Sequence, residues 1–205
     1  MNKSRLPNLT KKNLIRARRV LFEVTELLDN ENIIYHLEGG TLLGIVRDND
    51  LLPWDHDVDI SILNQSISKV FSIKDKLRKK GYRISIRKSQ IESGPIKVGD
   101  YSIIKIKPII PYYINWILPK FGRRYVVLDI FIKTNYNNHT YWQAQGKLMR
   151  VENKYYESFE TIVYKEHVLK TPNYFRDYLT QKYGDWSIPI KEWECGRDEK
   201  TVVDK

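Results

Sequence analysis

The chain has 205 residues, of which 41% are hydrophobic and 12% aromatic, so its composition excludes a disordered chain and predicts a single domain over residues 1–205. The lone Cys195 excludes an intrachain disulfide and a multi-cysteine zinc site, and the four histidines show no metal-binding spacing such as HExxH. A formal net charge of +10 favours anionic partners such as nucleic acid, acidic lipid or phosphate-bearing substrates, without choosing among them.

The N-terminal part of the chain predicts an amphipathic helix. Apolar residues recur at helical spacing from about Leu9 to Asn30, and Thr10 is a candidate cap near its start. Residues 1–12 lack the apolar core of a secretory signal, and no segment reaches the roughly 20 apolar residues of a membrane-spanning helix. We therefore expect a cytoplasmic protein, with peripheral membrane contact as an open alternative.

The next elements surround a glycine turn. Residues 33–40 are typical of a strand that enters this turn, and residues 41–47 of a short helix whose N-terminus would attract phosphate. A second strand is expected at 57–63. Residues 65–80 are expected to form a helix that ends at Gly81.

The second half of the chain predicts further strands at 82–88, 101–107 and 125–133. Thr171 and Pro172 are interpreted as the start of a helix that Gly184 ends. Lys147 and Arg150 are expected on a helix, where they could reach an anionic substrate but would more often be solvated. The last fifteen residues are polar and are expected to be mobile.

The segment 109–121 combines apolar and aromatic residues with two prolines, and basic residues flank it. This composition suits a membrane interface, and the segment could dock a lipid-linked or polymeric acceptor; it is too short to span a bilayer. The alternative is a long ordered loop that packs over the core.

Three aspartates stand at alternate positions, Asp55, Asp57 and Asp59. In an extended strand they would share one face, with His56 on the other. Three neighbouring carboxylates repel one another, whereas a divalent cation prefers such oxygen ligands. The pattern therefore predicts a site for Mg²⁺ or Mn²⁺ and phosphate chemistry.

A glycine turn, this aspartate strand and the later Asp129 together are typical of two-metal phosphoryl transfer, in which carboxylates on neighbouring strands hold the metals. Asp129 could supply a third ligand or orient the nucleophile. Alone it would more often be an edge-strand residue or a buried, hydrogen-bonded carboxylate.

Four segments of the chain resemble the LicD/fukutin-type phosphotransferases of the nucleotidyltransferase-fold superfamily. They are GGTLLGIVR at 39–47, LLPWDHDVDISI at 51–62, LDIF at 128–131 and, more weakly, YGDW at 183–186. The resemblance implies an α+β fold, with a nucleotidyltransferase-like mixed β-sheet flanked by helices. It also implies that a CDP-linked donor, such as CDP-choline or a CDP-alditol, passes its phospho-group to a hydroxyl of a glycan or lipid-linked glycan and releases CMP.

The resemblance also implies roles for individual residues. Metal ligands would be Asp57, Asp59 and Asp129. The phosphate-cradling turn and a cation facing the donor diphosphate would be Gly39, Gly40, Thr41 and Arg47, since an arginine fork can hold two phosphate oxygens. Asp55 has three open roles: metal ligand, base for the acceptor hydroxyl, or partner of Arg47.

Other residues near these motifs have structural alternatives. Trp54 is interpreted as a core residue in preference to a base-stacking one, and His56 as a packed histidine. Glu38 could enter the site or be a surface acid at a strand end.

Two other functions remain open on the sequence. One is a nucleotidyltransferase that uses an NTP on a small molecule or RNA, and the other is a non-catalytic nucleotide-binding relative. Nucleic acid is not expected as a partner, because the basic residues are spread along the chain and no RNA-binding module is recognised.

Overall fold

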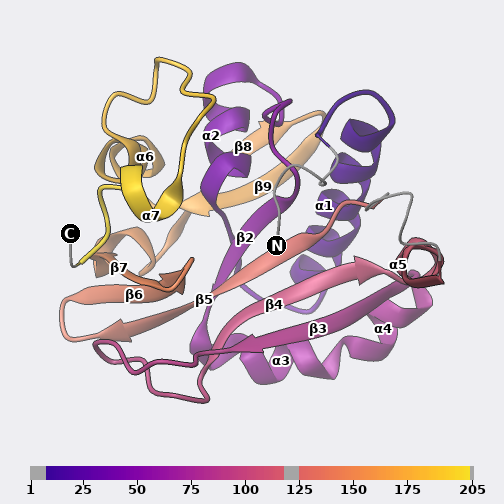
Figure 1. Cartoon of the computed structure of the whole chain (residues 1–205), viewed down its shortest axis with the longest axis horizontal. Coiled ribbons are helices and arrows are strands. Elements are labelled where there is room, and N and C mark those ends of the chain that lie inside the picture. Colours follow the sequence, from indigo (N-terminus) through magenta and orange to yellow (C-terminus); the bar gives the residue numbers. More distant parts are fainter. Residues whose placement is uncertain (1–7, 118–124, 204–205) are drawn as a thin grey trace.

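The computed structural model describes residues 8–117 and 125–203, which form a mixed α+β fold (Figure 1). A seven-stranded sheet has the order β1-β2-β5-β4-β3, with β6 beside β5 and β7 beside β6. Its strands are β1 (His36–Leu37), β2 (Val58–Leu63), β3 (Tyr82–Lys88), β4 (Tyr101–Pro108), β5 (Leu128–Tyr136), β6 (His139–Ala144) and β7 (Lys147–Glu152). A separate hairpin joins β8 (Phe159–Tyr164) to β9 (His167–Pro172).

The sheet is mostly antiparallel. Between the described strands, only β2 and β5 pair in parallel, and their register places Asp59 opposite Asp129. Both strands are largely buried, with apolar side chains such as Ile60 and Ile130 fully enclosed. The predicted mixed sheet flanked by helices is therefore confirmed.

Helices flank this sheet. They are α1 (Lys12–Asn30), α2 (Gly39–Asp48), α3 (Ile67–Ser72), α4 (Lys74–Lys79), α5 (Ile109–Ile117), α6 (Phe175–Tyr183) and α7 (Cys195–Asp198), with short 3-10 turns at Asn64–Ser66 and Asn153–Tyr155. In Figure 1, α3 and α4 lie behind β3 and β4, while α2 lies close to β2. Apolar residues of α1, α2 and the central strands form one continuous core.

The predicted opening helix is present, but it begins later than expected. It starts at Lys12 instead of Leu9, and Lys11 occupies the capping position without a side-chain hydrogen bond. Thr10, the predicted cap, uses its backbone carbonyl to accept from the Asn13 N–H at 2.9 Å. The predicted strand over 33–40 is reduced to β1, since Gly39 already belongs to α2.

The aspartate strand also begins later than the sequence indicates. β2 starts at Val58, so Asp55 and Asp57 lie in the segment that leads into it. The helix expected over 65–80 divides at Ile73 into α3 and α4, and it ends before Gly81, whose φ of 88° explains the glycine.

The strands expected in the second half are found, with shifted ends. β3 matches the prediction, β4 adds Pro108, and β5 runs from Leu128 to Tyr136. The helix assigned to Lys147 and Arg150 is wrong, because both lie on β7. The turn before β7 has positive φ at Gln145 and Gly146, which closes the β6–β7 hairpin.

The helix start assigned to Thr171 and Pro172 is wrong as well, because both residues end β9. The helix itself is present as α6, capped by Tyr174 in a left-handed conformation and ended by Gly184. The β8–β9 hairpin was not predicted; its turn residues Lys165 and Glu166 adopt positive φ without a glycine.

The end of the C-terminal segment is packed against the body, which argues against the expected mobility at residues 199–202, whereas residues 191–198 are exposed or partly exposed. Thr201 and Val202 are buried, and Val202 bridges to Met149 of β7. The prediction of a loop over 109–121 is corrected by α5, and residues 118–121 lie outside the described range. Among the described helices, none is both long and apolar enough to cross a membrane.

Candidate active site

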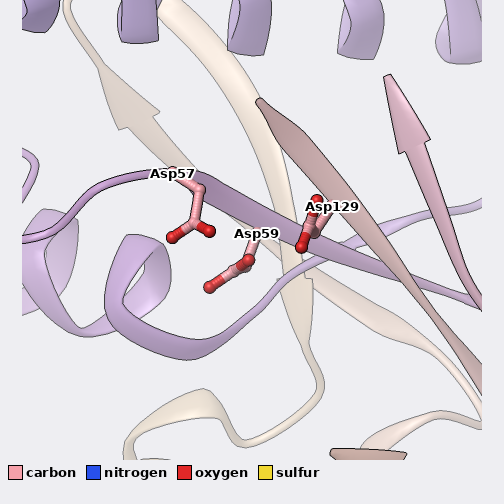
Figure 2. A group of neighbouring side chains, drawn as sticks. All are labelled: Asp57, Asp59 and Asp129. Atoms are coloured by element: carbon pink, nitrogen blue, oxygen red, sulfur yellow. The ribbon is translucent and has the colours of Figure 1, made fainter. Parts of the chain in front are cut away.

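Three carboxylates meet where β2 and β5 begin. Asp59 and Asp129 are register partners on the parallel strands, and Asp57 stands just before β2. Figure 2 shows their carboxylates close together on one side of the strands. One oxygen from each lies within 4.8 Å of the others. The structure thus brings the three predicted metal ligands into one cluster.

The electrostatics of this cluster fit a divalent cation. Burial, followed by the charge of Asp57 and then that of Asp55, raises the pKa of Asp59 well above its usual range. The Oδ1 atom of Asp129 is buried, and no hydrogen-bond partner for it is found among the described residues. A cation would relieve the repulsion and satisfy this oxygen, so the donor set suits Mg²⁺ or Mn²⁺.

Lys105 is part of the site, although the sequence analysis did not identify it. It stands opposite Asp129 in the β4–β5 register, and its Nζ forms an ion pair with Asp129 Oδ2. Both side chains are almost buried. The pairing of β4 with β5 places Lys105 here, and that pairing has no local signal in the sequence.

The two glycines at the start of α2 make room for the carboxylates. Gly39 has a φ of 57°, and a Cβ atom there would lie 2.8 Å from Asp59 Oδ2. A Cβ on Gly40 would lie 2.2 Å from Asp55 Oδ2. Any larger residue would therefore displace an acidic side chain, and the close approach explains the Gly-Gly pair.

Thr41 links α2 to the aspartate strand. Its buried hydroxyl oxygen accepts a hydrogen bond from the Asp59 backbone N–H at 2.8 Å. This contact fixes the height of α2 relative to β2 and thereby the position of the Asp59 carboxylate.

Arg47 lies at the other end of α2 and lines the same cavity. Its Nε and Nη2 each donate to Asp48 at 2.8 Å, and Nη1 donates to the Trp186 carbonyl at 3.4 Å. Its guanidinium lies 5.9 Å from the ring centre of Trp54. The carboxylate that holds Arg47 by two hydrogen bonds is thus Asp48.

Trp54 and His56 both line the cavity beside Asp55. The two-residue alternation that placed His56 on the face opposite the aspartates does not apply here, because residues 55–57 precede β2. Trp54 packs partly against the core, as expected, and its remaining surface faces the cavity.

Glu38 lines the cavity and is buried, so the alternative that it enters the site holds and the alternative of a surface acid is wrong. It is buried and accepts from Tyr178 at 2.5 Å and Tyr156 at 2.8 Å, and it pairs with Lys133 at 2.9 Å and Lys182 at 3.1 Å. Burial alone would raise the pKa of Glu38, but the two lysine charges hold it well below its usual range. A fixed polar network thus supports the turn that carries the glycines.

The cavity has a volume of about 650 Å³. Its acidic centre is flanked by basic residues from two directions. Arg47 and Lys191 come from α2 and the C-terminal segment, while Arg87 and Lys105 come from β3 and β4. Such a cavity has room for a nucleotide-sized ligand whose phosphates would meet a cation at the carboxylates.

Comparison with known families decides the relationship. The sequence profile described as LicD/FKTN/FKRP, nucleotidyltransferase domain, matches residues 32–174, which is well over half of the chain. The chain belongs to the LicD/FKTN/FKRP family. The resemblance read from the motifs is therefore confirmed, and this family assignment supports a transferase role.

The matches to individual related proteins extend over only part of this chain and part of each relative. An uncharacterized protein of Rickettsia typhi is 33% identical over 86 residues, which are 42% of this chain and 28% of that protein. One of Rickettsia prowazekii is 26% identical over 127 residues, or 62% and 42% of the two chains. The human ribitol 5-phosphate transferase FKRP is 43% identical over 44 residues, or 22% and 9%. The chain thus spans less than half of the length of these relatives.

Solved structures that are similar to this chain include the lincosamide antibiotic adenylyltransferase LnuA bound to lincomycin. The TM-score is 0.45 at 20% identity, and the match covers 84% of this chain and 85% of that one. A second is ANT(2")-Ia in complex with adenylyl-2"-tobramycin, with a TM-score of 0.43, 13% identity and coverage of 87% and 83%. Likenesses at this level say nothing about the substrate.

Proposed function

We propose that this LicD-family chain is a metal-dependent phosphotransferase. It moves a substituted phospho-group, of the phosphocholine or phospho-alditol type, from a CDP-linked donor to a hydroxyl of a glycan or glycan precursor, and CMP is released. The observation that carries the proposal is the cluster of Asp57, Asp59 and Asp129 inside a cavity of a family member. The partial match to a ribitol 5-phosphate transferase supports the same reaction class.

In this proposal the three aspartates hold Mg²⁺ or Mn²⁺, which would supply positive charge to the donor phosphates. At the N-terminus of α2 the Gly39 N–H donates to Glu38 Oε1 at 3.2 Å, so the Gly40 N–H is the one assigned to the phosphate, and the absence of side chains at both glycines lets the phosphate approach. Thr41 acts by holding Asp59 in place. Arg47 lies where it could share its guanidinium between Asp48 and the donor.

The proposed reaction is an in-line displacement. The acceptor oxygen forms a bond to the donor phosphorus farther from cytidine, while the bond between that phosphorus and the bridging oxygen breaks. The bridging oxygen leaves with its electron pair as part of CMP. We assign Asp55 as the group that accepts the hydroxyl proton, because it lines the cavity next to Gly40.

The decisive experiment measures CMP release with Mg²⁺ from CDP-choline, CDP-ribitol and CDP-glycerol in the presence of glycan acceptors. We expect release from one of them, and a loss of at least about 100-fold in Asp57→Asn, because that change removes a charged ligand. Asp75→Asn, on the exposed surface of α4, serves as the matched control. Pyrophosphate release from an NTP, with no CMP from any donor, would replace the proposal with a nucleotidyltransferase.

Peripheral membrane contact through residues 109–121 remains part of the proposal. On α5, the side chains of Ile110 and Ile117 are 71% and 66% exposed, and Ile114 is also exposed. Apolar side chains on a protein of net charge +10 suit an anionic lipid surface. We expect flotation with phosphatidylglycerol vesicles and its loss in the double variant Ile110→Ser/Ile114→Ser; equal flotation of both proteins would rule out α5 as the contact.

A further inference from the structure

Basic side chains gather on the face of the sheet that carries the catalytic cluster. In the β3–β4 register, Arg83 stands opposite Lys107 and Ser85 opposite Lys105, while Lys105 is in turn opposite Asp129 of β5. Residues that face each other across a ladder point to the same side of a sheet, and so do residues two apart in a strand. We define the basic face as Arg83, Arg87, Lys105 and Lys107.

The other side of these strands is closed. Ile104 and Ile106, which alternate with the lysines of β4, are fully buried. Figure 1 shows α3 and α4 on that side, and no described helix lies on the side of the basic face over β3 and β4. Arg87 is exposed, and Arg83 and Lys107 are partly exposed. A ligand can therefore reach the basic face from solvent.

The four basic groups act on one another. Burial, then the charge of Lys105, then that of Arg83, lowers the pKa of Lys107; the negative charge of Asp129 opposes these effects, and Arg87 adds to them. Like charges that face each other across a ladder reduce stability. A bound polyanion would remove this repulsion, whereas a neutral ligand would leave it in place.

The basic face opens into the catalytic cavity. Arg87, Ile103, Lys105 and Phe131 all line it, together with the acidic cluster. The donor is assigned to the α2 side, where Gly39, Gly40 and Arg47 lie. A ligand on β3 and β4 would approach the same cluster from the other direction, which is where the second substrate must come from.

We propose that the basic face binds phosphate groups already present in the acceptor, so that the acceptor is a phosphate-bearing chain rather than a neutral sugar. This inference rests on the proposed transfer to a glycan hydroxyl and defines the chemical class of that acceptor. Residues two apart on a strand are separated by roughly 7 Å, and neighbouring strands by about 5 Å. The face can therefore contact more than one phosphate of a flexible phosphodiester chain.

Binding of a labelled inorganic polyphosphate chain to the full chain, without divalent metal or donor, tests the inference by fluorescence anisotropy. The test variant is Arg83→Gln/Arg87→Gln/Lys107→Gln. Its matched control, Lys74→Gln/Arg78→Gln/Lys79→Gln, removes the same charge from exposed positions of α4, on the closed side. We expect at least about 10-fold weaker binding and a smaller salt dependence in the test variant only. Labelled dextran, a neutral chain, should bind to none of the proteins.

Several results would overturn the inference. Equal weakening in both variants would mean that only net charge matters. Displacement of polyphosphate by CDP-choline would assign the phosphate site to the donor, and tighter binding of single-stranded RNA than of polyphosphate would assign it to nucleic acid. If the triple variant fails to fold in a thermal melt, the exposed Arg87→Gln is compared with Arg78→Gln in the same assay, with at least a 2-fold difference expected.

A kinetic measurement separates this inference from the proposed function. CMP release to water, without acceptor, should be unchanged in the double variant Arg83→Gln/Lys107→Gln, whose two residues lie outside the cavity lining, whereas the KM for a poly(glycerol phosphate) acceptor should rise at least about 10-fold. An unchanged acceptor KM would contradict the inference. The binding assay involves no turnover, so an inactive wild-type protein would contradict the proposed function alone.

Discussion

Asp59 shows how the surroundings of one residue define the site. Its backbone N–H donates to the Thr41 hydroxyl, and its carboxylate lies against Gly39. Burial makes the largest contribution to the raised pKa of this carboxylate, and the charges of three other aspartates raise it further. An isolated carboxylate in this position would be protonated or displaced. The geometry therefore makes sense when a cation completes it.

The glycine turn gives a prediction at the same scale. Gly40→Ala should reduce CMP release at least about 10-fold and destabilise the protein by about 1–3 kcal/mol, because its Cβ would meet Asp55 Oδ2 at 2.2 Å. Gly196→Ala is the control, since its Cβ would meet nothing closer than 3.9 Å and neither glycine needs a positive φ. Steady-state kinetics and urea unfolding measure both effects; equal behaviour of the two variants would contradict the assigned contact.

The proton acceptor gives a second prediction. Asp55→Asn should lower kcat at least about 100-fold while Mn²⁺ binding persists, because a base acts on the hydroxyl and a ligand acts on the metal. Mn²⁺ titration and the pH profile of kcat distinguish these roles. If metal binding is lost together with activity, Asp55 is a ligand.

A third prediction concerns His36, which is buried in β1. Burial lowers the pKa of His36 to about 4, compared with about 6.5 for a free histidine. The unfolded chain therefore takes up the proton first, so His36 contributes stability that is complete above pH 6.5 and is lost as the pH falls toward 4. The loss should be about 3 kcal/mol. Urea unfolding between pH 7 and 4.5 should show a shallower decline in His36→Gln; identical declines would contradict this assignment.

At the level of helices and strands, the local sequence was sufficient to predict an element where a helix ends at a glycine or where apolar and polar residues alternate along a strand. Gly81 and Gly184 end their helices as predicted, and β3 matches its predicted range. The β8–β9 hairpin was missed because its turn adopts positive φ at Lys165 and Glu166, which are not typical turn residues. β7 was not predicted as a strand, because a run of six residues does not by itself distinguish a strand from a helix.

The candidate site could be predicted only in part, because only some of its residues belong to local sequence motifs. The acidic motif and the glycine turn are contiguous in the sequence and could be recognised. Lys105 and the network around Glu38 depend on which strands pair and on contacts between residues more than a hundred positions apart, as between Glu38 and Tyr178. No local pattern encodes such contacts.

The C-terminal segment yields a prediction about an element. Glu199→Gln should destabilise the protein by about 3 kcal/mol, because it removes one partner of a buried ion pair with Lys182, 3.0 Å long. Glu194→Gln should change stability by less than about 1 kcal/mol, because its pair with Arg197 is exposed. Chemical denaturation of both variants measures this difference, and equal stabilities would show that the segment is not anchored through Glu199.

At the scale of the whole molecule, the cavity is assembled from distant parts of the chain. The acidic cluster comes from β2 and β5, one set of basic residues from α2 and the C-terminal segment, and the other from β3 and β4. An acidic centre between two basic regions suits a reaction that brings two phosphate-bearing substrates to one cation. This arrangement explains how a chain of net charge +10 can hold a cluster of aspartates in its cavity.

We infer that Asp57, Asp59 and Asp129 form one divalent-cation site. Titration with Mn²⁺, followed by electron paramagnetic resonance of the free ion, tests it most directly. The account predicts binding by the wild-type protein and by Asp75→Asn, and at least about 10-fold weaker binding by Asp129→Asn, with all three proteins folded by circular dichroism. Undiminished Mn²⁺ binding in Asp129→Asn would contradict the account.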